Sequence, residues 1–145
     1  EKRLQVWKWE SENLVEYIIL ITFLSYPKNI IEKYQLCSFS KQLCSDLRYV
    51  KSKNMLGASD VYLQIKNENN NTYYTVNENK KDIKTVNLSK NITLKTNQNK
   101  FKFNQNGSIG KGATIHIILN DLTKEITVTP TGGRVLLKEG KYEWW

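Results

Sequence analysis

The sequence predicts an α+β fold, in which one long N-terminal helix packs on an antiparallel β-sheet head. In the first third of the chain, apolar residues recur at three- and four-residue intervals, which is the period of an amphipathic helix. From residue 60 onward, apolar and polar residues alternate in short runs separated by Asn- and Gly-rich turns, which is typical of strands. At 145 residues the chain has the size of a single domain.

The N-terminal part begins with a charged, leader-like segment at residues 1–13, and an apolar run follows from Leu14 to Tyr26. This run is shorter than the roughly 20 residues that cross a bilayer. Two interpretations stay open, a core helix and a helix that inserts partly into a membrane interface. A secretory signal would carry positive charge at its start, whereas acidic residues such as Glu16 stand there.

The predicted N-terminal helix spans residues 14–53, with a kink near Pro27, because proline interrupts helical hydrogen bonding. Over residues 28–53 the apolar stripe faces a core, and Gly57 is a plausible stop just beyond its end. The residues expected to dock this helix on the sheet are Leu36, Phe39, Leu43, Leu47 and Val50.

The two cysteines, Cys37 and Cys44, fall on this predicted helix, seven residues apart. At 1.5 Å per residue their separation is about 10 Å. A disulfide requires Cα atoms within roughly 7 Å of each other. Both are therefore expected to be unpaired and to act as small apolar packing residues.

The β-rich head is expected to occupy residues 58–145 as a meander of seven or eight short strands in one sheet. The glycine-rich segment of residues 107–112 lacks the spacing of a phosphate loop and leads into a strand, so we expect a hairpin turn there. The runs that predict strands are 61–65, 74–76, 92–94, 101–103, 113–119, 125–129 and 134–137.

Catalytic signals are sparse, and the sequence predicts a protein that is not an enzyme and holds no metal or cofactor. His116 lies within an apolar run, where a strand residue is a better interpretation than a base or a ligand. No serine stands in a nucleophile elbow, and no cysteine pair has zinc-site spacing. The acidic residues are scattered along the chain, so folding alone would have to assemble a carboxylate pair.

The charge balance is strongly basic, with a formal net charge of +8 and a pI of about 9.4. Such an excess favours acidic partners, and a solvated basic surface is the alternative interpretation. Between residues 79 and 112 stand eight lysines and a single acid, Asp82. Lysines that alternate with apolar residues also occur on the wet face of any half-buried sheet. The candidate DNA contacts are Arg134, Lys95, Lys100, Lys102 and Lys111.

Three segments, taken in order, carry a family resemblance. Residues 13–16, followed by the apolar stretch YIILITFL, resemble the start of type IV pilins. Residues 39–52 are similar to a helix segment with a Gln-Leu-x-x-Asp-Leu-Arg pattern in the GspH/FimT family of minor pilins and pseudopilins. Residues 103–107, the run at 113–119 and the stretch EITVTPTGGRV at 125–135 resemble the C-terminal half of that family. The resemblance covers residues 14–137.

The resemblance implies a pilin-like fold and a non-enzymatic structural subunit of a type IV pilus, a type II secretion pseudopilus or a competence pilus. Such a subunit primes or caps assembly, is processed by a prepilin peptidase, and sits in the bacterial cell membrane and at the cell surface. Its partners would be other pilins, and Glu16 would neutralise the N-terminal amine of a neighbouring subunit.

An alternative function is a DNA-binding receptor at the tip of a pilus used for DNA uptake. Some relatives used in DNA uptake carry a Gly-Arg-x-Arg motif near the C-terminus. Gly133 and Arg134 match its first two positions, whereas Leu136 stands where the second arginine would be.

Overall fold

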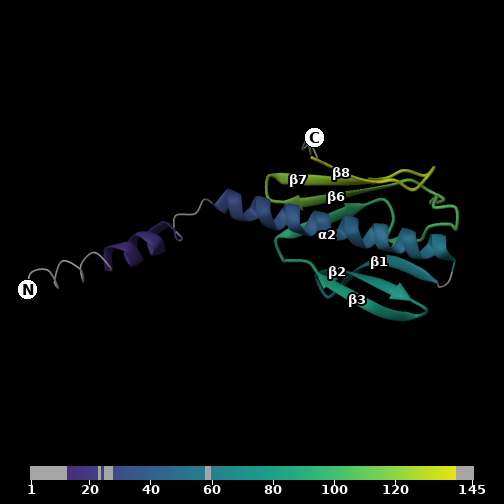
Figure 1. Ribbon diagram of the computed structural model, residues 1–145, viewed down its shortest axis with the longest axis horizontal. Coiled ribbons are helices and arrows are strands. Elements are labelled where there is room, and N and C mark those ends of the chain that lie inside the picture. Colours follow the sequence, from purple (N-terminus) through teal and green to yellow (C-terminus); the bar gives the residue numbers. More distant parts are fainter. Residues whose placement is uncertain (1–12, 23, 25–27, 58–59, 140–145) are drawn as a thin grey trace, which may run out of the picture. The chain divides into compact units, whose positions relative to one another are not determined.

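The computed structural model describes residues 13–22, 24, 28–57 and 60–139 of the chain (Figure 1). The chain divides into two compact units, residues 1–32 and residues 33–145. In the first unit, residues 13–22 and Leu24 are helical. The predicted kink at Pro27 and residues 1–12 of the leader-like segment lie outside the described residues.

Helix α2 (Lys28–Leu56) begins where the sequence predicts it and runs three residues beyond the predicted end. It ends at Gly57, whose φ of +68° lies in the left-handed region that glycine adopts without strain. The amide of Gly57 donates to the carbonyl of Asn54 at 3.1 Å, which closes the last turn. Lys53 lies in that turn, where a positive charge interacts favourably with the helix dipole.

Within residues 60–139 the head contains two four-stranded antiparallel sheets where the sequence predicted one. In the first sheet the order is β3-β2-β1-β5, and in the second it is β4-β6-β7-β8. The strands are β1 (Val61–Glu68), β2 (Asn71–Glu78), β3 (Lys81–Asn87), β4 (Ile92–Thr96), β5 (Lys100–Phe101), β6 (Ala113–Leu119), β7 (Leu122–Val128) and β8 (Val135–Glu139). The single-sheet prediction was wrong because alternation along a strand indicates its buried face and not its neighbours.

The connection from β5 to β6 also differs from its prediction. It joins the first sheet to the second, so residues 107–112 form part of a crossover loop and not a hairpin turn. Gly107, at φ +84°, forms a turn within this loop, in which its amide donates to the carbonyl of Asn104 at 2.9 Å.

Asparagine residues form most of the tight turns in the hairpins of the first sheet. Asn69 and Asn70, between β1 and β2, have φ of 52° and 62°, and Asn79 and Lys80, between β2 and β3, have 53° and 68°. Two successive residues at positive φ are typical of the type I′ turn that matches the twist of paired strands. Asparagine tolerates this conformation better than most residues, which explains its use at these turns.

One hydrophobic core joins α2 to both sheets. In the view of Figure 1, β6, β7 and β8 appear on one side of α2, and β1, β2 and β3 on the other. From the first sheet the core takes Leu63 and Tyr74, and from the second Ile115 and Ile126, all fully buried. The fold is therefore α+β, with a helix packed on antiparallel sheets.

Candidate functional site

The helix of the first unit carries Glu16, the expected assembly residue. The side chain of Glu16 is exposed. Eight apolar or aromatic side chains around it each expose between 54% and 80% of their surface, and these are Leu14, Val15, Tyr17, Ile18, Ile19, Leu20, Ile21 and Leu24. Tyr17 and Leu20 border a shallow hollow beside Glu16. The segment thus presents uncovered apolar surface with a carboxylate within it, a combination typical of interaction surfaces.

The five residues expected to dock the helix on the sheet all lie in the core of the second unit. Leu36, Phe39, Leu43, Leu47 and Val50 are each 8% exposed or less. The ring of Phe39 packs edge-on against that of Tyr74 on β2, with the ring centroids 6.1 Å apart. Aromatic pairs favour this geometry over face-to-face stacking.

The contact between α2 and the first sheet includes a buried carboxylate, that of Asp46. The hydroxyl of Tyr74 donates to Asp46 Oδ2 at 2.6 Å, and Lys84 Nζ on β3 donates to Asp46 Oδ1 at 2.8 Å. Burial, together with this hydrogen bond, raises the pKa of Tyr74 well above its usual value. The carboxylate therefore has a partner on each oxygen, which offsets the cost of burying its charge.

Asn54 holds the last turn of α2 to the strands. Its Nδ2 donates to the carbonyl of Val61 at 2.8 Å, and its Oδ1 accepts from the amide of Phe103 at 2.9 Å. One buried side chain thereby satisfies two backbone groups from separate segments, which is a strong reason for an amide at this position.

The turn between β7 and β8 gathers basic side chains from α2. Arg48 Nη2 donates to the carbonyl of Val135 at 3.1 Å, and Lys51 Nζ donates to the carbonyl of Gly132 at 2.7 Å. Arg134 lies between these two acceptors in the chain, and its side chain is exposed. Arg48, Lys51 and Arg134 are called the turn cluster below.

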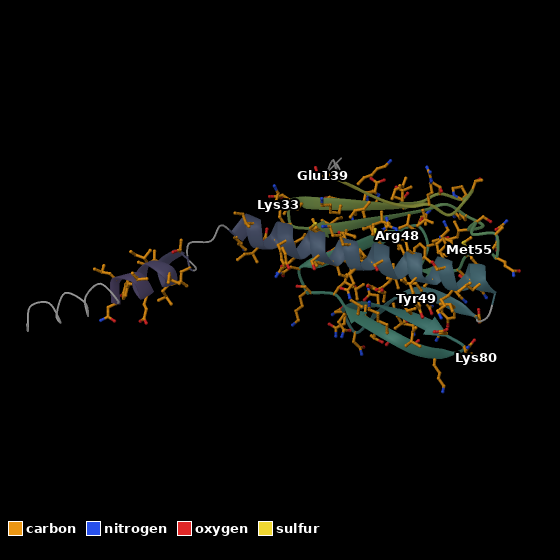
Figure 2. The ribbon with its side chains drawn as sticks, viewed as in Figure 1. Lys33, Arg48, Tyr49, Met55, Lys80 and Glu139 are labelled. Carbon is orange, nitrogen blue, oxygen red and sulfur yellow. The ribbon has the colours of Figure 1, made fainter. Side chains whose placement is uncertain are left out.

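Figure 2 shows how α2 divides its side chains between the two sheets. Arg48 lies on the side of β8, in agreement with its hydrogen bond to Val135. Tyr49 lies on the side of β2, where its hydroxyl donates to a carboxylate oxygen of Glu78 at 3.4 Å. Two successive residues of the helix therefore form hydrogen bonds with different sheets.

Two of the predicted DNA contacts, Lys100 and Lys102, lie near one carboxylate. Lys102 forms an ion pair with Asp60, and Lys100 Nζ lies 4.2 Å from the ring centroid of Tyr62. The hydrogen bond from Lys102, together with the positive charges of Lys102, Lys100 and Lys80, lowers the pKa of Asp60. Three lysines around one exposed carboxylate leave this region positive.

The other two lysines among the predicted contacts lie on β4 and in the crossover loop. Lys95, on β4, lines a hollow together with Lys66 of β1. Lys111 belongs to the crossover loop, where its carbonyl accepts from Gln98 Nε2 at 3.4 Å. Nearby in this loop, the amide of Ile109 donates to the carbonyl of Pro130 at 3.2 Å, so the loop packs on the β7–β8 turn.

The histidine lies on β6, and both cysteines lie on α2. His116 is half-buried in β6, paired in register with Lys95 on one side and Glu125 on the other. Cys44 is buried and Cys37 half-buried, and both are unpaired, as expected. Burial raises the pKa of the Cys44 thiol, which keeps it protonated and unreactive. Among residues 13–22, 24, 28–57 and 60–139, no three His, Cys, Asp or Glu side chains are placed to hold a metal ion.

Sequence reasoning missed Arg48 and Lys51, although Asp46 and Arg48 lie in a segment that it singled out. Each basic residue directly follows a core residue of α2 in the chain, so both are expected at the edge of the buried stripe of the helix. Nothing local predicts that this edge meets a turn more than 80 residues away, so only the tertiary structure reveals the turn cluster.

Within the part of the chain that the structure describes, no helix is both long enough and apolar enough to cross a membrane. Comparisons with protein-family models, with curated proteins and with solved structures found no match to this chain.

Proposed function

We propose that this chain is a minor pilin or pseudopilin, a non-enzymatic structural subunit that primes or caps a type IV pilus-like filament. The observation that carries the proposal is the exposed apolar helix around Glu16. Its partners are other pilins and a prepilin peptidase, and it resides in the bacterial cell membrane and at the cell surface.

The apolar side chains of residues 14–24 favour burial against another helix or in lipid, since uncovered apolar surface costs about 25 cal/mol per Å². Burying Glu16 with them costs several kcal/mol unless a positive group pairs with it. The N-terminal amine of a neighbouring subunit is such a group. The chemistry of this segment therefore supports packing between subunits.

The described part of α2 supports the same function. Its later turns pack on both sheets, whereas Ile30 and Ile31, in its first turn, are about half exposed, at 51% and 48%. Tyr34 exposes 75% of its surface. One part of α2 thus packs in the core, and another part leaves apolar residues exposed. This division suits a subunit that packs against its neighbours through its N-terminal region.

The test is Glu16→Ala in cells that assemble the filament. We expect filaments counted by electron microscopy to fall at least tenfold, while thermal unfolding of the purified protein is unchanged. The matched control is Glu139→Ala, which removes an exposed carboxylate from the head and should leave filament number within twofold. Normal filament number in the Glu16 variant would contradict the proposal.

A second candidate function, capture of DNA at the filament tip, is favoured by the turn cluster and by Lys80, Lys100 and Lys102. These basic groups lie on α2, in the β7–β8 and β2–β3 turns, and on β5 or just after it. Phosphate contacts of this kind release counterions, so affinity for duplex DNA falls with salt at a log–log slope of about −0.9 per contact.

The test of this second function is a gel-shift titration with duplex and single-stranded DNA over a salt series. Arg134→Ala should reduce the duplex slope by about 0.9 and weaken binding of all sequences alike. Lys138→Ala, an exposed lysine of β8, is the matched control and should change neither quantity. An absence of binding at low salt, or an Arg134 variant identical to wild type, would rule this function out.

A further inference from the structure

Two strand edges border one hollow in the head. β4 is an edge strand of the second sheet, and on the outer side of β1 the strand β5 pairs with Leu63 and Gln64, leaving the later residues of β1 beyond its end. A hollow of about 370 Å³ is lined by Ile65, Lys66 and Asn67 of β1 and by Leu94, Lys95 and Thr96 of β4. An unpaired strand edge is a template for another strand.

The backbone of β1 points toward this hollow at Asn67. On the outer side of β1, the amide of Ile65 donates to the carbonyl of Asn99 at 2.8 Å. Since alternate residues of a strand direct their amide and carbonyl to the same side, those of Asn67 also point outward. Asn67 pairs in register with Thr72 of β2. The carbonyl of Thr72 accepts from the amide of Leu88 at 3.0 Å and therefore points away from β1. In such a pair the backbone groups of both residues point away from each other, which confirms that those of Asn67 point outward.

The same alternation directs the backbone of Leu94 outward from β4. The amide of Ile92 donates to the carbonyl of Ser89 at 3.0 Å and not to β6. On β6, the amide of Thr114 donates to Asn97 Oδ1, so the backbone groups of Thr114 point toward the β4 side. By alternation, the backbone groups of residues 116 and 118 point to the same side. Their partners on β4 are the odd-numbered residues, so the even-numbered Leu94 presents its amide and carbonyl to the open side.

Asn67 and Leu94 line the 370 Å³ hollow and also an adjoining one of about 220 Å³. The two hollows share Asn67, Thr72 and Leu94 in their linings, and together they are called the groove below. Residues 88–90 line the smaller hollow, and Asn99 lines the larger one. The groove contains Lys66, Lys90 and Lys95, and no Asp or Glu is among the residues that line it. Glu68, the nearest acid along β1, is not part of the lining.

We propose that this groove, between β1 and β4, binds an extended acidic segment of a partner protein by strand addition. The main chain of the segment pairs with the outward groups of Asn67 and Leu94, and its carboxylates face the lysines. β4 has five residues, so the paired segment is about that length. The proposal does not depend on the filament function, because it rests on the head alone.

The first test is NMR of the full ¹⁵N-labelled chain with an equimolar pool of five-residue peptides. Each peptide is acetylated and amidated, with Glu at alternate positions and Val, Ile, Thr or Tyr between them. The amides of Asn67 and Leu94 should shift on titration and exchange with solvent at least tenfold more slowly. A pool with Lys in place of Glu should give no such change. No effect at these two amides at millimolar acidic pool would overturn the proposal.

Protein variants test the contribution of charge. Lys66→Glu with Lys90→Glu should weaken binding of the acidic pool at least tenfold. The matched control is Lys81→Glu with Lys138→Glu, which makes the same charge change on the outer edges of the two sheets, and it should stay within twofold of wild type. Equal binding by both double variants would overturn the groove as the site.

A change to the ligand tests the strand pairing without perturbing the fold. N-methylation of the second and fourth residues of each peptide removes the amides along one edge, so affinity should fall at least tenfold. If the methylated pool binds equally well and an oligothymidine displaces it, the groove is a polyanion site. That result would overturn the strand-addition proposal.

Discussion

Gly133 lies in the β7–β8 turn at φ +55° and is buried against the crossover loop. A Cβ at this position would lie 2.1 Å from the carbonyl oxygen of Gly107 and 2.9 Å from Cδ1 of Phe103. Backbone of another segment cannot move aside as a flexible side chain does. Glycine is therefore required here by close packing as well as by the left-handed backbone.

Gly133→Ala should lower the free energy of unfolding by at least about 3 kcal/mol, since a steric clash adds to the strain of a left-handed residue. Gly132→Ala is the matched control. Gly132 also has a positive φ, +78°, but nothing lies within 4 Å of a Cβ there. It should cost only about 1–2 kcal/mol. Urea denaturation measures both, and equal losses would contradict the close-packing argument.

Tyr74 makes stability depend on pH in the alkaline range. The unfolded chain loses the phenolic proton near its ordinary pKa of about 10, whereas burial and the bond to Asp46 keep the proton in place in the folded state. Above pH 10 the unfolded state thus binds fewer protons, and the free energy of unfolding falls by about 1.4 kcal/mol per pH unit. Below pH 10 this contribution is fully present.

Tyr74→Phe should flatten this alkaline decline and, through loss of the hydrogen bond to Asp46, lower stability by about 1–3 kcal/mol at neutral pH. Tyr34→Phe, at an exposed position of α2, is the control and should keep the decline of wild type. Thermal unfolding between pH 8 and pH 11 gives both curves. An unchanged slope in the Tyr74 variant would show that another group is responsible.

Helix α2 combines core packing and exposed apolar residues in one element, so substitutions along it should differ widely in their effect on stability. Leu43→Ala removes a fully buried side chain and should cost about 2–5 kcal/mol of unfolding free energy. Ile30→Ala, at a half-exposed position, should change stability by about 0.5 kcal/mol or less. Denaturant unfolding measures the two, and a large loss in the Ile30 variant would indicate that the residue belongs to the core.

The elements differ in how far sequence predicts them. α2 and most strands follow their hydrophobic period, so their positions were expected within a few residues. β3 was missed because almost all of its residues are exposed, and an exposed edge strand has no alternation to detect. The pairing of β1 with β5 and of β4 with β6 depends on contacts between distant segments, which local pattern does not contain.

The same limit applies to the candidate sites. The five core residues of α2 and the exposed glutamate at position 16 stand in periodic or motif-like segments, which made them visible in sequence. Arg48, Lys51 and Asp60 act through neighbours that only the fold supplies. The basic residues singled out in sequence stand on or beside different elements, because a count of lysines along the chain carries no information about where the fold places them.

At the scale of the head, α2 and both sheets share one core, so we expect a single cooperative unfolding transition. Val76→Ala in the first sheet and Ile126→Ala in the second should each lower the opening free energy of the slowest-exchanging amides in both sheets. Native-state hydrogen exchange by NMR measures this. Protection retained in β6 while β2 becomes unprotected would indicate two separate folding units.

The stripe of core residues on α2 also has a mechanical consequence. From Leu36 to Val50 it extends about 21 Å along the helix axis, at 1.5 Å per residue. Tension applied along this axis would load the five anchoring side chains in shear, all at once, and would not peel them off one by one. Rupture under load is governed by the rate of unfolding. The head, loaded along this helix, would therefore resist traction with all five side chains together.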